Sequence, residues 1–321
     1  MICRDSCTRR IPTDEASGGR RYGGRVCGGR ALRAAGLQVD QDLFCGNGFE
    51  ADGEIGLHGV HVGADLILTG GEFRNAGGTA FRADMLQVDE NVFCGDGFEA
   101  DGEVRLVGAH VGGRLDLSGG RFRNKDGSAL AADGLQVDRG VSCGEGFQAD
   151  GEVRLVGGHF GRLDLTGGKI RNSGGTALIA QEIQVNSSLH WKPAEVIGHV
   201  SFMFGSVRVW ADSTTHLDIR LVLDSFRYER LFPLPPEVTA AQRISWLDRD
   251  PAGYSPQPFS QLASVYRAEG HDRAARQVLI ASQSRRRRQH SGWYGWIERA
   301  WSGLLRVTVG YGYRPWLACS G

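Results

Sequence analysis

Long apolar runs are missing from this 321-residue chain. No uninterrupted apolar stretch approaches the roughly 20 residues that are needed to span a bilayer. The N-terminus also lacks an apolar segment after its positive charges, so it does not resemble a secretory signal peptide. We therefore expect the chain to stay in the cytoplasm.

Cysteine is scarce and has no familiar spacing. The chain contains seven cysteines, and an odd total is typical of a reducing compartment. Cys3, Cys7, Cys27 and Cys319 lie near the termini without the spacing of a zinc finger. The other three lie in a repeated region in which no Ser/His/Asp or Cys/His constellation stands out, so the sequence does not indicate catalysis there.

The chain also has no net charge, but this total hides a strong asymmetry. Lys and Arg minus Asp and Glu give +4 for residues 1–30, −11 for residues 31–225 and +7 for residues 226–321. We expect an Arg- and Gly-rich segment over 1–30 that is disordered up to about Tyr22, a repeat domain over 31–225, and a helical, basic, Trp-rich region over 226–321.

Glycine is abundant, with 48 residues, because it recurs at fixed points of a repeat. A 49-residue unit over 31–79 recurs over 80–128 and again, one residue shorter, over 129–176. Each unit has two similar halves, so we expect coils of 23 to 26 residues. The coils are expected to begin at Gly36, Gly59, Met85, Gly108, Gly134, Gly157 and about Glu182. Such periodicity predicts a solenoid.

Apolar residues two apart, such as Leu37 and Val39, predict short strands with one buried side. Four such pairs per coil, joined in a right-handed sense, predict a mainly β protein: a right-handed four-sided parallel β-helix with a helical C-terminal region. The stretch Arg25 to Ala31 resembles a later turn and suggests an earlier coil. An internal ladder of rings is predicted from phenylalanines every 24 or 25 residues: Phe49, Phe73, Phe98, Phe122 and Phe147, followed by Ile170.

Three cysteines, Cys45, Cys94 and Cys143, share one position of the repeat. Equivalent positions are two coils apart, roughly 9.6 Å at the spacing of strands in a sheet, which exceeds the limit of about 7 Å for a disulfide. Leucines fill the same position in the alternate coils, namely Leu68, Leu117 and Leu165. We therefore interpret the three cysteines as small buried apolar residues.

Other recurring polar residues invite a metal interpretation that their spacing does not support. The histidines of one register, His61, His110 and His159, are too far apart to share one zinc ion. Separate metal sites that also use Glu54, Glu103 and Glu152 are not favoured, because polar residues beside turns in a repeat do not require a metal. The motif GNGFEADGE lacks the regular Asp spacing of calcium-binding repeats, and it does not fit a dinucleotide loop because it leads into another strand. Asn75, Asn124 and Asn172 are interpreted as turn residues with positive φ. We expect no cofactor and no metal.

The character of the chain changes from Phe232. Thr239 is expected to cap a short helix that runs to Asp248. A helical hairpin is predicted from PFSQLASVYRAEG and HDRAARQVLIASQSRRRRQHS, with Gly270 closing the first helix and Asp272 capping the second.

An apolar stripe at helical spacing follows four consecutive arginines. It contains Trp293, Trp296, Ile297, Ala300, Trp301, Leu304 and Leu305. Such a helix suits either the headgroup layer of an anionic membrane or the open end of the β-helix, which needs a cap. The residues proposed to contact a membrane or a partner are Arg285, Arg286, Arg287, Arg288, Trp293, Trp296, Trp301 and Arg306.

Both halves of the chain resemble a known family. Repeats of the form ALxADGLxVxxxLFxxxGFxADGEVRLxGAxVGGxLDLSGGxFxN, then YSPQPFSQLASVYRAEGHDRAARQVLIA and TVGYGYRPW, resemble bacterial proteins often labelled membrane-associated oxidoreductase. The repeats are also similar to a loosened pentapeptide-repeat family. In the former proteins GYGYRPW leads into membrane spans, whereas this sequence ends at Gly321, so we expect a truncated or naturally short form.

These observations together predict a non-enzymatic binding or scaffolding solenoid that is peripheral to the inner face of the membrane. Its expected partners are an anionic membrane surface, through the C-terminal region, and a protein on the β-helix, with no nucleic acid. One alternative is an acidic rod that mimics DNA and inhibits a DNA-binding enzyme. A second alternative, an oxidoreductase, is implied by the family label.

Overall fold

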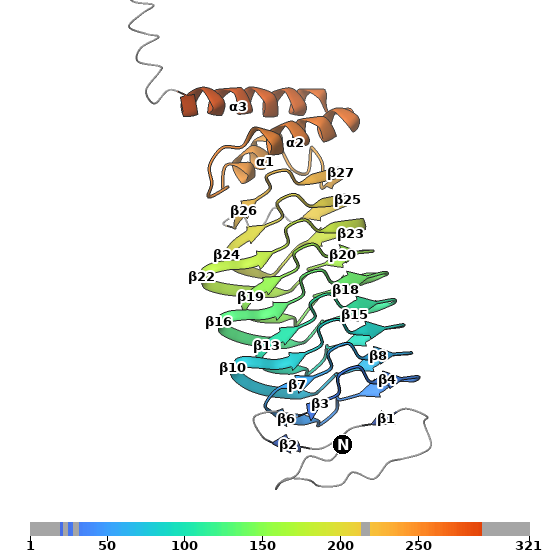
Figure 1. The fold of residues 1–321 in the computed structure, drawn as a ribbon. Helices are drawn as coiled ribbons and strands as arrows, with labels where there is room; N and C mark the ends of the chain where they lie inside the picture. The colour runs from blue at the N-terminus through green and yellow to red at the C-terminus, as the bar shows by residue number, and fades with distance from the viewer. Residues whose placement is uncertain (1–19, 22–24, 28–31, 213–218, 291–321) are drawn as a thin grey trace, which may run out of the picture. The chain divides into compact units, whose positions relative to one another are not determined.

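A computed structural model describes residues 20–21, 25–27, 32–212 and 219–290. These residues form a parallel β-solenoid of about eight turns, followed in sequence by three helices (Figure 1). The chain separates into two compact units, residues 1–253 and residues 254–321. The predicted mainly β fold with a helical C-terminal region is confirmed, while the four-sided section and the right-handed sense stay predictions.

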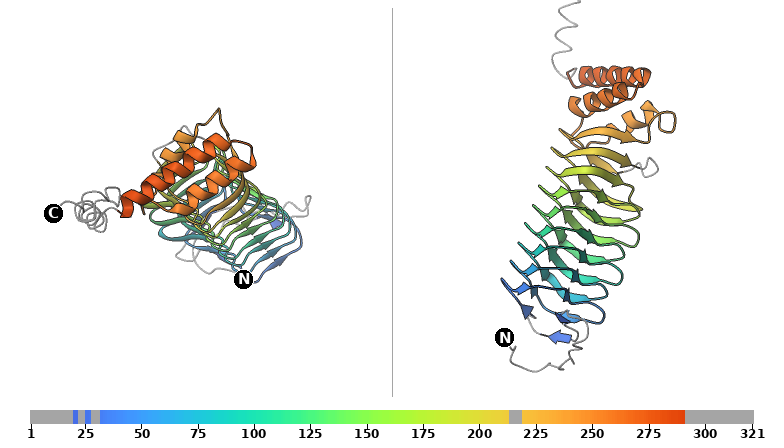
Figure 2. Two further views of the ribbon diagram at one scale, coloured as in Figure 1. Left: turned by 90° about the horizontal axis from the view of Figure 1, so that it is seen from above. Right: turned by 90° about the vertical axis from the view of Figure 1, so that its right-hand side faces the viewer.

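The strands of successive coils pair in parallel and lie one above another (Figures 1 and 2). A 16-stranded sheet contains β1 (Arg20–Arg21), β4 (Gln38–Val39), β5 (Leu43–Phe44), β8 (His61–Val62), β9 (Leu66–Ile67), β11 (Gln87–Val88), β12 (Val92–Phe93), β14 (His110–Val111), β15 (Arg114–Asp116), β17 (Gln136–Val137), β18 (Gly140–Ser142), β20 (His159–Phe160), β21 (Leu163–Asp164), β23 (Gln184–Trp191), β25 (Ser206–Asp212) and β27 (Arg227–Phe232). An 11-stranded sheet contains β2 (Arg25–Cys27), β3 (Leu32–Arg33), β6 (Glu50–Asp52), β7 (Ile55–Gly56), β10 (Glu72–Arg82), β13 (Glu99–Arg105), β16 (Arg121–Ala131), β19 (Gln148–Arg154), β22 (Lys169–Ile179), β24 (Glu195–Ser201) and β26 (Arg220–Val222).

Each predicted coil start adopts a left-handed backbone conformation. The φ angles at the seven positions from Gly36 to Glu182 lie between 57° and 68°. The same conformation recurs at Phe204 (φ 60°) and Ser225 (φ 59°). The coils therefore continue beyond the part of the chain in which the repeat is visible in the sequence.

Strands also precede the first recognisable repeat. β1 pairs with β5, and β2 pairs with β6, both in parallel. An earlier coil, expected from the likeness of Arg25 to Ala31 to a later turn, is therefore confirmed. The disorder expected up to about Tyr22 stays a prediction, because only Arg20–Arg21 of that stretch are described, as β1, while residues 1–19 and 22–24 lie outside the described ranges.

The predicted ladder of phenylalanine rings runs through the core. Phe49, Phe73, Phe98, Phe122 and Phe147 are at most 2% exposed, and consecutive ring centroids lie 5.2 to 5.5 Å apart. This spacing suits tilted aromatic contacts.

The rings come alternately from two positions of the coil. Phe73 is in register with Ala51 and Ala100, whereas Phe98 precedes Ala100 by two residues. Its counterpart in the neighbouring coil is Gly71, where a Cβ would lie 2.9 Å from the Phe73 ring. Each ring of the ladder thus faces a small residue in the next coil, which explains why the sequence repeats every two coils.

The long strands β10, β16 and β22 each contain a shift in register, and an asparagine side chain forms a hydrogen bond across it. Asn75 donates from Nδ2 to the carbonyl oxygen of Thr79 at 2.8 Å, and Asn124 and Asn172 do the same in the next copies. The prediction of positive φ for these three asparagines is wrong, because their side chains, rather than their backbone, shape the turn. The adjacent coil passes close below: a Cβ at Gly102 (φ 130°) would lie 2.5 Å from the Asn75 carbonyl oxygen.

The helix α1 (Ala240–Leu247) belongs to the same compact unit as the coils. It begins after Thr239, which forms the predicted cap together with Gln242. Trp246 on α1 packs against Trp210 of β25, with ring centroids 5.0 Å apart. Trp210 also contacts Phe226 and Tyr228, so aromatic side chains fill this end of the core and α1 covers it.

The second unit contains α2 (Pro256–Ala268) and α3 (Asp272–His290), which form the predicted hairpin. Gly270 adopts φ 79° at the turn, as expected for a residue that ends a helix. The predicted cap at Asp272 is wrong by one residue. His271 accepts the first helical hydrogen bond, from the Ala275 amide at 3.0 Å, so Asp272 lies in the first turn, where its charge suits the helix dipole.

Replacement of Phe98 by Ala is expected to lower the free energy of unfolding by about 3 to 5 kcal/mol, because it leaves a cavity between two rings. Chemical denaturation of the variant and of an exposed-site control, Gln87→Ala, measures the effect. A Phe98→Ala variant as stable as the control would contradict the inward ladder.

Candidate functional site

The contact residues predicted from the sequence are only partly described. Trp293, Trp296, Trp301 and Arg306 lie outside the described residues. Arg285 to Arg288 lie near the end of α3, which carries six arginines and one acidic residue. Arg286, Arg287 and Arg288 are exposed.

Arg285 differs from the other three arginines because it packs within the hairpin. Its guanidinium carbon lies 5.5 Å from the centre of the Phe259 ring, and its Nη1 donates to the Ala281 carbonyl oxygen at 3.0 Å. The exposed positive charge of this segment is therefore presented by the three arginines that follow.

The repeat cysteines are structural, as predicted. Cys45, Cys94 and Cys143 are unpaired and at most 2% exposed. Burial raises the pKa of Cys45 to about 12 and also raises the pKa of the other two thiols. These thiols therefore stay protonated and poorly reactive.

The recurring histidines and glutamates are used in contacts between coils. His61 and His110 lie 3.0 and 3.2 Å from carboxylate oxygens of Asp89 and Asp138. Glu54 pairs with Arg82 at 3.0 Å. No group of three or more His, Cys, Asp or Glu side chains in the described ranges is arranged to hold a metal ion.

One strip of the 16-stranded sheet changes identity between the repeat copies. Where the first copy has Asp65, the later copies have Arg114 and Arg162. Where the first copy has Gln41 and the second Glu90, the third has Arg139. Since coil building does not require these changes, the strip is a candidate for a specific role.

These residues surround a hollow of about 580 Å³ over β15, β18 and β21, which we call the arginine hollow. The residues that line it form two rows. One row contains Arg114, Gly140 and Arg162, with Arg139 next to Gly140, and the other contains Phe93, Asp116, Ser142 and Asp164, while Leu115 and Val141 lie between the rows. Gly140 is in register with Arg114, and the coil beyond it contributes Arg162. The strand β18, which lies between the strands of these two arginines, therefore has no side chain at this position.

The electrostatics of the arginine hollow leave an excess of positive charge. Asp164 is partly buried, but hydrogen bonds from Thr166 and the charges of His190 and Arg162 outweigh burial and lower its pKa. Burial and the charge of Arg162 lower the pKa of His190, although Asp164 opposes this shift. At neutral pH the three guanidinium groups thus face two carboxylates and a neutral imidazole.

Among the described residues, two of the three arginines form no ion pair. Arg162 donates to Asp164 at 2.9 Å and lies 3.2 Å from Nδ1 of His190. Arg114 and Arg139 make no ion pair with any residue in the described part of the chain. The arginine hollow can therefore accept an anionic group without breaking an existing ion pair.

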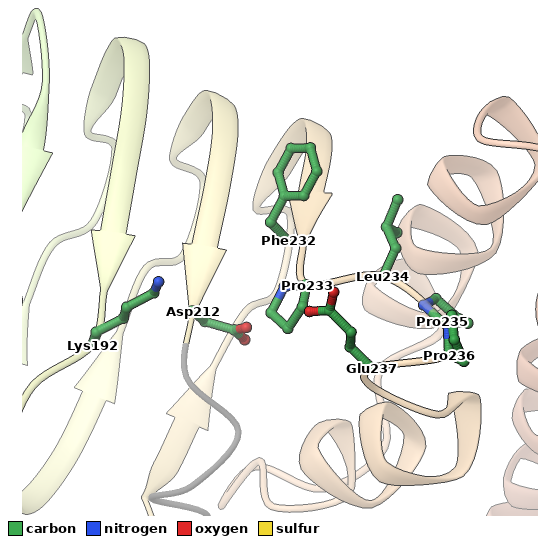
Figure 3. A pocket seen from close by; sticks show the side chains of 8 residues that line it. All are labelled: Lys192, Asp212, Phe232, Pro233, Leu234, Pro235, Pro236 and Glu237. Carbon is green, nitrogen blue, oxygen red and sulfur yellow. The ribbon is translucent and has the colours of Figure 1, made fainter.

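A second hollow, of about 550 Å³, lies beside the loop that precedes α1 (Figure 3). Lys192 and Asp212 reach it from neighbouring coils, and Glu237 reaches it from the loop, beside Pro233, Leu234 and two further prolines. It combines charges of both signs with an apolar wall.

The carboxylate of Asp212 is already committed to α1. Arg243 is 1% exposed and binds Asp212 through both terminal nitrogens, one of them at 2.8 Å, and also donates to the Pro233 carbonyl oxygen at 3.1 Å. Burial raises the pKa of Asp212, and the charge of Arg243 opposes that shift. We conclude that this pair anchors α1 on the coils.

The sequence interpretation missed both non-repeated charge clusters. The arginine hollow leaves a signal, since aligning the repeat copies shows charge reversals at single positions. The pair of Asp212 and Arg243 leaves none, because the two residues are 31 positions apart and outside the repeat.

Comparison with protein-family models, with curated proteins and with solved structures finds no match for this chain. Among the helices of the described residues, none has both the length and the apolar character that crossing a membrane requires.

Replacement of Arg243 by Met is expected to destabilise the first unit by about 3 to 5 kcal/mol, because it leaves a buried carboxylate without its partner. The double variant Arg243→Met, Asp212→Leu should recover much of the loss, since it removes both charges. Chemical denaturation measures both, with exposed Arg227→Met as the control. Equal destabilisation of the single and double variants would argue against an anchoring ion pair.

Proposed function

We propose that the protein is a non-enzymatic binding or scaffolding solenoid and that its C-terminal helical region binds an anionic membrane surface at the inner face of the membrane. The observation that carries the proposal is the exposed arginine run of α3. Residues 254–290 contain seven arginines and two acidic residues. Each basic residue near an anionic surface contributes about 1 kcal/mol.

The covered end of the coils supports this interpretation over a capping role for the Trp stripe. Solenoids need a cap over each exposed end of the core. α1 buries Ala240, Arg243, Trp246 and Leu247 and covers the aromatic end of the coils. The stripe from Trp293 to Leu305 is therefore not required for that purpose, and its apolar face suits the membrane interface.

The alternative of a DNA-mimicking rod is less favoured by the distribution of charge. Residues 31–104 contain three Lys or Arg and fourteen Asp or Glu, whereas residues 105–225 contain thirteen of each. The acidic part thus covers about three coils, or roughly 14 Å at the strand spacing. Since B-DNA carries one charge per about 1.7 Å, this length corresponds to only about four base pairs.

Redox activity, the other alternative, receives no support from the thiols of the repeats. Their burial and raised pKa values do not suit thiol chemistry. We propose instead that the coils present a binding surface to a protein partner, as solenoids with varied outer residues do.

Vesicle co-sedimentation of the full chain tests the membrane proposal. The parent protein should bind vesicles that contain phosphatidylserine and bind weakly to vesicles of phosphatidylcholine alone. Serine replacements of Arg286, Arg287 and Arg288 should weaken binding by up to about 3 kcal/mol at low salt, while lysine replacements at the same positions should retain it. The variant Trp296→Ser, Trp301→Ser should lose the part of the binding that salt does not screen.

The same double Trp variant separates the membrane role from a structural role. If the stripe contacts a membrane, the thermal unfolding of the variant matches that of the parent. A lowered melting temperature, together with no vesicle binding by the parent protein, would end the membrane proposal.

A further inference from the structure

The arginine hollow is the feature of the coils that neither the repeat nor the membrane proposal explains. Arg114 and Arg162 lie two rungs apart, roughly 9.6 Å between their Cα atoms at the strand spacing, with Gly140 between them. A Cβ at Gly140 would lie 2.8 Å from the Arg162 carbonyl oxygen, so this rung stays open. The cavity volume falls within the range of about 300 to 1,000 Å³ that is typical of small-molecule sites.

The basic side of the arginine hollow suits an oxyanion. Guanidinium groups bind carboxylates and phosphates through paired, charge-assisted hydrogen bonds. Arg114 and Arg139 are both exposed and lack an ion pair within the described ranges, so they can serve this purpose without losing a contact. Arg162 is held in place by Asp164 at 2.9 Å.

The opposite side offers acceptors and an aromatic ring rather than more positive charge. Asp116 accepts the Ser118 amide at 3.0 Å on Oδ1 and keeps a second carboxylate oxygen. Ser142 lies 2.9 Å from the Ser118 hydroxyl and keeps further hydrogen-bonding capacity. Phe93, which is partly exposed, forms an apolar edge. A simple inorganic anion would leave this side unused.

We propose that the arginine hollow binds a hydroxylated organic anion, namely a sugar unit that carries a carboxylate or a phosphate group. Arg114 and Arg139 hold the anionic group, and Phe93 packs against the apolar face of the ring. Asp116 accepts hydrogen bonds from sugar hydroxyls, and the Ser142 hydroxyl donates to or accepts from them. The proposal concerns only the coils and does not depend on membrane binding.

Isothermal titration of the full-length protein tests the proposal with two probes, trigalacturonate for the carboxylate and glucose 6-phosphate for the phosphate. Binding of either probe at millimolar concentration supports the site and identifies the source of the anion. Maltotriose, which is neutral, and inorganic phosphate, which has no sugar, should bind more weakly than the better probe.

Two variants locate the binding. Arg114→Gln and Arg139→Gln should each weaken the better probe about tenfold or more, as expected for loss of a charge-assisted hydrogen bond. Arg121→Gln, which removes an exposed arginine from the other sheet, should leave the affinity unchanged. The thermal unfolding of the three variants shows whether each one is folded.

Three outcomes would overturn the proposal. The first is that neither probe binds the parent protein. The second is that inorganic phosphate binds as tightly as trigalacturonate and glucose 6-phosphate, and the third is that folded Arg114→Gln and Arg139→Gln variants retain the parental affinity. The third outcome would move the site away from the arginine hollow even if the parent protein binds a probe.

Discussion

One packing constraint governs the ladder of phenylalanines: each coil from Phe49 to Phe147 contributes one ring to it, and each of these rings faces a small residue in the neighbouring coils. Phe98 stacks between Phe73 and Phe122 at 5.3 and 5.2 Å. Glycine or alanine occupies the matching positions of the neighbouring coils, as at Gly71 and Ala100. Because the rings come from alternate positions, two coils rather than one form the unit that the sequence repeats.

The outer surface follows from the same stacking. Side chains of adjacent coils lie about 4.8 Å apart, close enough for ion pairs between coils. Arg105 with Asp84 and Arg154 with Asp133 are repeated examples, at 3.2 and 2.8 Å. A repeated charge is thus mostly explained by its neighbour in the next coil. A charge that changes between copies, as at Arg114 and Arg139, is not explained in this way and points to binding.

The features that could be predicted from the sequence are those that depend on period. The coil starts, the ring ladder, the buried cysteines and the Thr239 cap all rest on local patterns, and all are confirmed. The role of Asn75 could not be predicted, because its side chain bonds to the backbone of an irregular strand whose shape is visible only in three dimensions. The ion pair between Asp212 and Arg243 could not be predicted for the same reason, since the two buried residues come from distant segments of the chain.

The candidate sites could also be predicted only in part. The arginine run at the end of α3 is evident from composition, but only the structure shows that Arg285 packs on Phe259 while the next three arginines are exposed. The arginine hollow combines residues from four coils, and Gly140 leaves the position between Arg114 and Arg162 without a side chain. The aligned sequences show the changes of charge, but they do not show that these residues surround a hollow.

Exchange of Phe98 and Ala100 within one coil tests the packing constraint most directly. The variant Phe98→Ala, Ala100→Phe keeps the composition and the number of rings, but it places this ring at the position used by Phe73 and Phe122 in the neighbouring coils. Its free energy of unfolding should fall by about as much as that of a core Phe→Ala change, roughly 3 to 5 kcal/mol. Stability equal to that of the parent protein would show that any ring in the core suffices and would contradict the alternating two-coil arrangement.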